Sequence, residues 1–163
     1  MNSILVVVAH SDDEVLGCGG TIAGYSEMGI PVDVVYMTDG VSSRGGNETT
    51  KFAKDRKLDA ARAAKVLGVR ETVQFEFPDN ELDSIPLLKV VKCVEGCIQK
   101  FNPHTIYTHF LHDLNIDHRI VAQACLTATR PQTSCPVREL YGFEVNSSTA
   151  VSYTHLRAHE TDR

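Results

Sequence analysis

Five apolar, β-branched runs recur along this chain, with helical patterns between them. The runs are ILVVVA (4–9), VDVVYMT (32–38), TVQFEF (72–77), HTIYTH (104–109) and LYGFEV (140–145). The first run is continuously apolar instead of alternating, as expected of a strand with both faces covered. Strands that alternate with helices are typical of βαβ units around a parallel sheet. The sequence therefore predicts an α/β fold.

Four helices are expected between these strands, over about 13–28, 51–67, 85–100 and 116–129. The first should stop at Gly29, because glycine readily adopts the conformation that closes a helix. In the third helix we expect inward-facing side chains at Leu88, Val91, Cys93 and Val94. Together the elements predict a Rossmann-like, doubly wound, mostly parallel sheet in the order 3-2-1-4-5, with helices on both faces.

The 163 residues are enough for one domain with its own core. We assign residues 1–150 to this single domain. Residues 151–163 (VSYTHLRAHETDR) lack apolar periodicity and resemble a translated adapter, so we expect a non-native or disordered tail. The polar, glycine-rich segment 39–50 is too long for a plain connector and is expected to be a functional loop.

The formal charge of −5 provides no basic face, so nucleic acid is not an expected partner. No run approaches the roughly 18 apolar residues of a membrane span. Because MNSILVVV lacks basic residues and a cleavage pattern, we expect a cytoplasmic protein. The five cysteines include no C-x-x-C pair, which favours reduced thiols. The oligomeric state is left open.

Histidines and aspartates gather where the first and fourth strands end. The segments are HSDDE (10–14) and HFLHDLNIDHR (109–119). In a doubly wound sheet, ligands bind outside the carboxyl ends of the strands, at the point where strand order reverses. With the order 3-2-1-4-5 these two segments should face each other across one crevice.

A divalent cation would offset the repulsion between the adjacent carboxylates of Asp12 and Asp13. His10, Asp13 and His118 form a ligand set that suits catalytic zinc, which takes three protein ligands and keeps one open position. Asp12 would then lie beside the ion as a general base. Another divalent transition metal, such as iron or cobalt, would accept the same ligands. The structural alternatives are a helix N-cap for either aspartate and a hydrogen-bonded surface residue for either histidine.

The stretch VVVAHSDDEVLGCGGTIA resembles the signature of the PIG-L/LmbE-like zinc N-deacetylases, usually AHPDDE before a glycine-rich helix start. The resemblance extends over about residues 4–145, through TDG (38–40), the segment 56–68, PDNELD (78–83) in place of PDG, and NIDHR (115–119) in place of HPDHR. It implies the same roles for His10, Asp13 and His118 as metal ligands and for Asp12 as base. It also implies a substrate with an N-acetylated glucosamine unit.

Three further residues acquire roles from this resemblance. Arg56 would hold a hydroxyl, phosphate or carboxylate of the substrate as a forked donor, although an arginine on a charged helix is otherwise solvated. Asp79 would bind sugar hydroxyls, its alternative being an ordinary turn residue. Asp113 would orient a metal-binding imidazole from behind, or would be a plain loop residue.

Two positions depart from the family pattern. Ser11 replaces a proline, which changes loop stiffness more than chemistry. Asn115 replaces a histidine that stabilises the oxyanion or protonates the leaving amine. As a catalytic residue Asn115 could donate a hydrogen bond but could not shuttle a proton. Asp12 would then serve as base and acid in turn, or His109 or His112 would substitute.

The sequence thus predicts a zinc-dependent hydrolase that removes the N-acetyl group from an N-acetylglucosamine-type amino sugar or its conjugate. One alternative is another metal-assisted amide or ester hydrolase of this fold. A second is a catalytically impaired sugar-binding or regulatory domain. A third is a fragment, because family members continue past the fifth strand. The group attached to the sugar is left open.

Overall fold

The computed structural model describes residues 3–40, 49–131 and 135–146. Its five strands form one sheet in the order β3-β2-β1-β4-β5, and each neighbouring pair is parallel. The strands are β1 (Ile4–Val8), β2 (Val32–Thr38), β3 (Glu71–Phe77), β4 (Thr105–His109) and β5 (Glu139–Phe143). The predicted strand order is confirmed.

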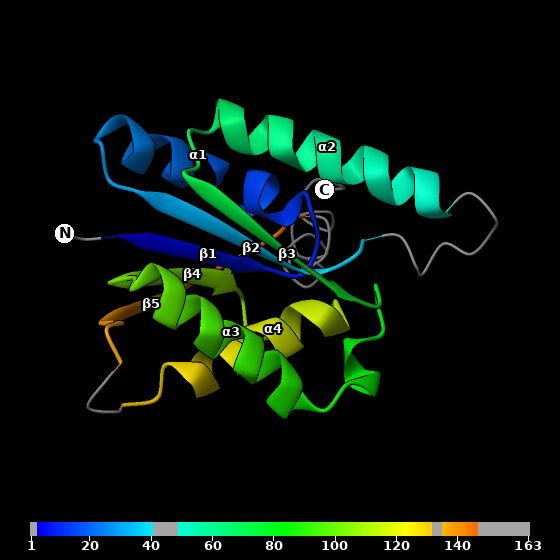
Figure 1. Ribbon diagram of the computed structural model, residues 1–163. Helices are drawn as coiled ribbons and strands as arrows, with labels where there is room; N and C mark the ends of the chain where they lie inside the picture. Colours follow the sequence, from blue (N-terminus) through cyan, green and yellow to red (C-terminus); the bar gives the residue numbers. More distant parts are fainter. Residues whose placement is uncertain (1–2, 41–48, 132–134, 147–163) are drawn as a thin grey trace, which may run out of the picture.

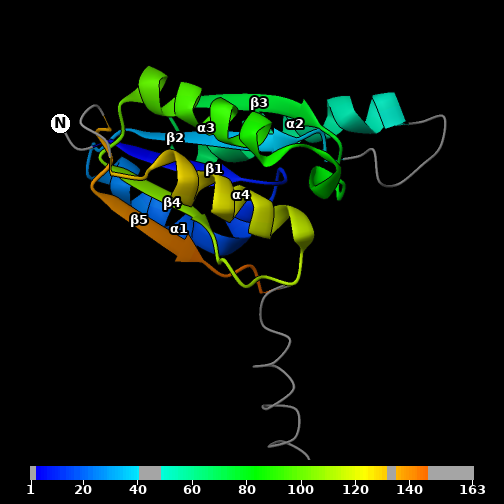
Figure 2. The same ribbon diagram turned by 90° about the horizontal axis from the view of Figure 1, so that it is seen from below.

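Helices cover both faces of this sheet (Figure 1). On one face lie α1 (Asp13–Glu27) and α2 (Thr49–Val66), and on the other α3 (Leu87–Phe101) and α4 (Ile116–Ala128). Figure 2 shows α3 and α4 side by side across the sheet from α1. The doubly wound arrangement is therefore confirmed. Within the described ranges, no helix has both the length and the apolar character needed to cross a membrane.

The core explains why the first strand is continuously apolar. Every residue of β1 is buried, and its side chains alternate between two clusters. Leu5 and Val7 belong to the cluster that contains residues of α3 and α4. Ile4 and Val6 belong to the cluster on the α1 face, with Ile22. Because both faces of β1 are covered, neither set can be polar.

The third helix differs from its prediction in two ways. A short 3-10 turn, η2 (Leu82–Ser84), precedes it, and α3 begins only at Leu87. Pro86 accounts for the later start, because the residue before a proline is disfavoured in helical conformation. The inward orientation predicted for Leu88 is wrong, since this residue is 66% exposed. The buried stripe runs through Val90, Val91 and Val94, and Leu88 lies outside it at 3.6 residues per turn.

Two predicted segments fall mainly outside the described residues. These are the tail 151–163 and the part of the polar loop from 41 to 48. Among the described boundaries, Gly29 follows α1 with a φ of 72°, as the predicted helix stop requires.

Candidate metal centre

The candidate site lies at the carboxyl ends of β1 and β4, which are hydrogen-bonded neighbours. His10 follows β1, and Asp13 is the first residue of α1. His118 lies in the first turn of α4, just after the loop that leaves β4. The two segments that the sequence analysis expected to face each other therefore meet at one edge of the sheet.

His10, Asp13 and His118 point three ligand atoms at one another. The distances are 3.3 Å from His10 Nδ1 to Asp13 Oδ2, 3.3 Å from His118 Nε2 to Asp13 Oδ2 and 3.3 Å from His118 Nε2 to His10 Nδ1. We call these three atoms the ligand triangle. Tetrahedral zinc with bonds of about 2.0–2.1 Å places its ligand atoms about 3.3 Å apart. The three buried side chains thus fit an ion of the size of zinc.

The charges around the triangle also suit a cation. Burial on its own would lower the pKa of the His10 ring, but contacts with three carboxylates raise it to about 11. These carboxylates belong to Asp117, Asp13 and Asp79. Burial also opposes charge on His118, yet Asp13 raises the pKa of that ring. The buried carboxylates thus favour positive charge at both rings, and a bound ion would supply that charge in place of protons.

The far nitrogen of each triangle histidine contacts a further buried carboxylate. His118 Nδ1 lies 2.9 Å from Asp113 Oδ2. His10 Nε2 lies 3.1 Å from Asp117 Oδ2 and 3.1 Å from Asp79 Oδ1. Metal-ligating histidines usually carry such a partner on the other ring nitrogen. Asp113 was predicted for this position from the sequence, whereas Asp117 was not, because its only signal is its place directly before His118.

Asp12 lies outside the triangle, with its side chain 54% exposed. Its Oδ2 accepts a hydrogen bond from Arg56 Nη2 at 3.3 Å. Asp12 holds the N-cap position of α1 but makes no side-chain capping bond. Asp13 Oδ2 instead accepts the backbone N–H of His10 at 2.8 Å. Neither Asp12 nor Asp13 therefore caps the helix through its side chain, which was the alternative role considered for these aspartates.

Asn115 is the N-cap of α4. Its Oδ1 accepts the backbone N–H groups of Asp117 and His118 at 2.8 and 3.3 Å. Its Nδ2 donates to Asn80 Oδ1 at 3.1 Å. Both ends of the amide are thus engaged in holding the loop, so a catalytic hydrogen bond from Nδ2 would have to replace the bond to Asn80.

Asp79 lies buried, with Oδ1 against His10. The next residue, Asn80, has a φ of 57°, in the left-handed region that favours glycine and that asparagine tolerates. This conformation explains how PDN can stand where the family usually has PDG.

Of the two candidate substitutes for the missing histidine, His109 is not placed to shuttle a proton. His109 is buried, and its Nε2 accepts the backbone N–H of Ala9 at 2.9 Å. Burial lowers the pKa of His109 to about 3, so its ring is neutral. The ring stacks on His118 with centroids 3.8 Å apart. His112 is exposed and packs edge-on against Phe110.

Sequence reasoning also missed Glu14, a buried carboxyl directly after the two aspartates. Its Oε1 accepts the hydroxyl of Tyr36 at 2.9 Å, while Oε2 has no hydrogen-bond partner within the described part of the chain. Burial raises the pKa of Glu14 to about 7. An acidic residue next to a predicted ligand was the available signal.

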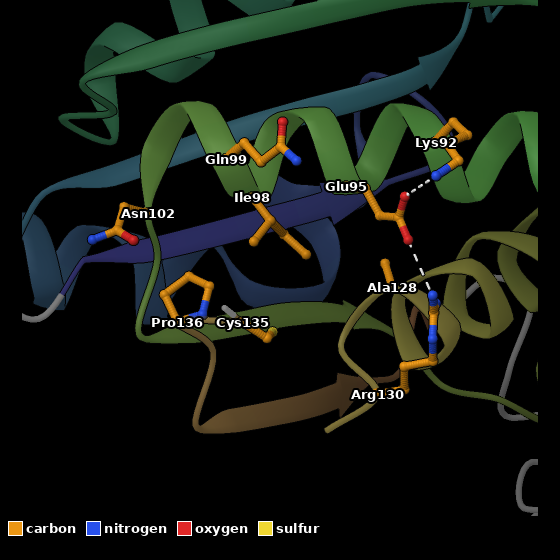
Figure 3. Close-up of a pocket in the computed structure, with 9 residues that line it drawn as sticks. All are labelled: Lys92, Glu95, Ile98, Gln99, Asn102, Ala128, Arg130, Cys135 and Pro136. Carbon is orange, nitrogen blue, oxygen red and sulfur yellow. Dashed lines mark hydrogen bonds and ion pairs between the residues drawn. The ribbon is translucent and has the colours of Figure 1, made fainter. Parts of the chain in front are cut away.

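A separate cavity of about 400 Å³ lies between α3 and α4. It adjoins Ala128, at the opposite end of α4 from His118. Figure 3 shows Glu95 between Lys92 and Arg130, which it contacts at 2.7 and 3.4 Å. Both Glu95 oxygens are thus engaged by cations of the cavity wall itself.

A family comparison agrees with the geometry of the site. The family model described as PIG-L: GlcNAc-PI de-N-acetylase matches residues 5–129. The chain belongs to the PIG-L family. The resemblance inferred from the AHSDDE and NIDHR segments is therefore confirmed. As its description states, the PIG-L family is one of deacetylases, which are hydrolases of amide bonds.

Among its relatives, this PIG-L chain is 30% identical over 150 residues to the uncharacterized deacetylase YaiS of Escherichia coli, covering 89% of this chain and 75% of that protein. N,N'-diacetylchitobiose deacetylase from Pyrococcus horikoshii is 27% identical, with a TM-score of 0.71, over 78% of this chain and 49% of that one. GalB, the 4-carboxy-2-hydroxymuconate hydratase of Pseudomonas putida, is 27% identical, with a TM-score of 0.69. The match covers 79% of this chain and 56% of the GalB chain. The chain thus spans about half the length of both solved relatives.

Proposed function

We propose that this protein is a metal-dependent N-deacetylase in which His10, Asp13 and His118 hold one zinc ion or a similar divalent transition metal. The observation that carries the proposal is the ligand triangle, whose three sides of 3.3 Å match tetrahedral zinc. Its membership in the PIG-L family supports amide hydrolysis. Its similarity to a diacetylchitobiose deacetylase supports an N-acetylglucosamine-type amino sugar, or a conjugate of one, as the substrate.

Asp12 performs the proton transfers in this proposal. Zinc in the triangle would polarise the acetamide carbonyl and lower the pKa of a bound water toward ~7. The Asp12 carboxylate accepts a proton from the water that attacks the carbonyl carbon. When the C–N bond breaks, Asp12 returns that proton to the amine nitrogen, so that acetamide and water give acetate and a free amine. Arg56 orients the Asp12 carboxylate through the 3.3 Å hydrogen bond from Nη2 to Oδ2.

Three residues complete the proposed site. Arg56 has five N–H donors and contacts Asp12 through one nitrogen, so its others would bind substrate oxygens. Asp79 would accept a sugar hydroxyl from its place against His10. Asn115 would donate Nδ2 to the developing oxyanion after releasing Asn80.

Amine release from N-acetylglucosamine conjugates tests this function. The zinc-loaded wild type should turn over, D12A should lose turnover while keeping its metal, and H118A should lose both. D59A and H104A are controls, because Asp59 is exposed and His104 precedes β4, at the other end of that strand from the site. Turnover in D12A equal to that of D59A would contradict the proposed base.

The similarity to GalB makes a hydratase the second candidate. A hydratase adds water to a carbon–carbon double bond and releases no amine. Incubation of the same zinc-loaded protein with an unsaturated dicarboxylic acid, followed by ultraviolet absorbance, separates the two reactions. A protein that binds the amino sugar stoichiometrically without either turnover would be the impaired binding domain that Asn115 suggests.

A further inference from the structure

We infer that Asp117 is a positioning residue that selects the ring nitrogen through which His10 binds the metal. The inference rests on the proposed metal site and extends it to a residue outside the ligand triangle. Asp117 lies in the first turn of α4 and is completely buried.

Three hydrogen bonds hold the Asp117 carboxylate. Oδ1 accepts the backbone N–H of Leu82 at 3.0 Å, and Oδ2 accepts that of Asn80 at 2.7 Å. The third contact is the 3.1 Å approach of His10 Nε2 to Oδ2. The two backbone donors belong to the turn between β3 and α3, so Asp117 is anchored to a second segment as well as to its own helix. Such a carboxylate cannot rotate away from His10 without losing both backbone bonds.

Which atom donates the hydrogen bond between His10 and Asp117 determines which nitrogen of the His10 ring carries the proton. Because both Asp117 oxygens already accept backbone N–H groups, His10 Nε2 is the donor in this contact. In a neutral ring the lone pair then lies on Nδ1, which is the atom in the ligand triangle. Asp113 acts in the opposite sense on His118, where it contacts Nδ1 and leaves Nε2 for the triangle. The two histidines thus present different nitrogens to one ion, with Asp113 behind His118 and both Asp117 and Asp79 behind His10.

A second metal bound by His10 Nε2, Asp79 and Asp117 is the competing explanation, since these atoms also lie close together. It would require deprotonation of Nε2 in a ring whose Nδ1 already faces the first site. The backbone N–H groups on Asp117 favour the positioning role, because they already occupy its oxygens. The number of zinc ions per chain decides between the two.

The test compares D117N with D83N, which changes an exposed aspartate in the neighbouring η2 turn. Zinc affinity is measured by competition with a chromophoric chelator, and the melting temperature is measured on the metal-free proteins. We expect one zinc per chain in the wild type and a 10- to 100-fold weaker affinity in folded D117N. In the zinc-loaded wild type, NMR should show a His10 Nε2–H resonance protected from water exchange, and D117N should lose this protection.

Two results would overturn the inference. One is a D117N protein that melts earlier but, where folded, binds zinc as tightly as D83N, which would make Asp117 purely structural. The other is two zinc ions in the wild type and one in D117N. The proposed function fails separately: a wild type that binds one zinc without releasing amine refutes the deacetylase and leaves the effect of Asp117 measurable.

Discussion

Oδ2 of Asp13 meets His10 twice, at 3.3 Å from ring Nδ1 and at 2.8 Å from the backbone N–H. The backbone bond joins the end of β1 to the first residue of α1, and the ring contact forms one side of the ligand triangle. A local strand-to-helix junction therefore orients two of the three proposed ligands before the rest of the site is considered. Only His118 has to be brought from a distant part of the chain.

Replacing Asp13 by asparagine should separate these two functions. The side-chain carbonyl in D13N can still accept the His10 backbone N–H, so the fold should persist, but the neutral amide is a poor ligand for zinc. We expect zinc affinity to fall by a factor of about 100 or more, as measured by chelator competition. D59N, at an exposed position, is the control. An affinity in D13N equal to that of D59N would remove Asp13 from the ligand set.

Zinc binding should release protons, and its affinity should fall as the pH is lowered. The pKa of His10 in the metal-free protein is raised to about 11, and that of His118 is raised as well. Both rings therefore carry a proton near pH 6 that an incoming ion must displace. Calorimetry in buffers of different ionisation enthalpy should find nearly two protons released at that pH. Release of no protons would mean that zinc binds elsewhere.

The parts of this site that the sequence predicts are those that follow from residues close together in the chain or from the strand order. His10, Asp12 and Asp13 are proposed as site residues because they follow one apolar strand, and His118 because the strand order places its loop opposite theirs. The fold itself follows from the buried β1 and β2, whose continuous apolar runs suit only a covered parallel sheet.

What the sequence could not predict depends on side-chain direction. Asp117 resembles any acidic residue in a first helical turn until the turn at Asn80 is seen to donate to it. Asp79 reads as a surface turn residue, yet it lies buried against His10. The exposed Leu88 was misplaced because it lies outside the stripe through Val90, Val91 and Val94 that α3 buries. Each case needs the packing of segments far apart in the chain.

Glu14 should make the metal-free protein less stable as the pH rises. Its folded pKa of about 7 exceeds the ordinary 4.5, so the native state binds the proton more tightly than the unfolded chain. This stabilisation is complete below about pH 4.5 and is lost as the pH rises through about 7. E14Q lacks the titrating group. From pH 4.5 to pH 8 the free energy of unfolding of E14Q should therefore rise relative to wild type, by up to roughly 3 kcal/mol.

Urea unfolding in the presence of a chelator, at several pH values, measures this difference. Comparing the same two proteins across pH cancels any constant cost of burying the glutamine amide. E27Q, at an exposed glutamate at the other end of α1, controls for the lost negative charge. A difference between E14Q and wild type that does not change with pH would show that Glu14 does not titrate in this range.

Gly17 should be required for the packing of β5 against α1. A Cβ at this position would lie 2.2 Å from Cδ2 of Phe143, whose ring also packs 5.3 Å from that of His109. G17A should therefore lower the free energy of unfolding by about 1–3 kcal/mol, measured by urea unfolding. G20A is the matched control in the same helix, because a Cβ there meets nothing within 4 Å, and it should be neutral or stabilising by up to about 1 kcal/mol. In the F143A background only the Glu144 carbonyl oxygen, at 3.3 Å, remains close to the added Cβ, so G17A should cost much less than it does in the wild type. An equal cost in both backgrounds would show that the effect of G17A does not come from Phe143.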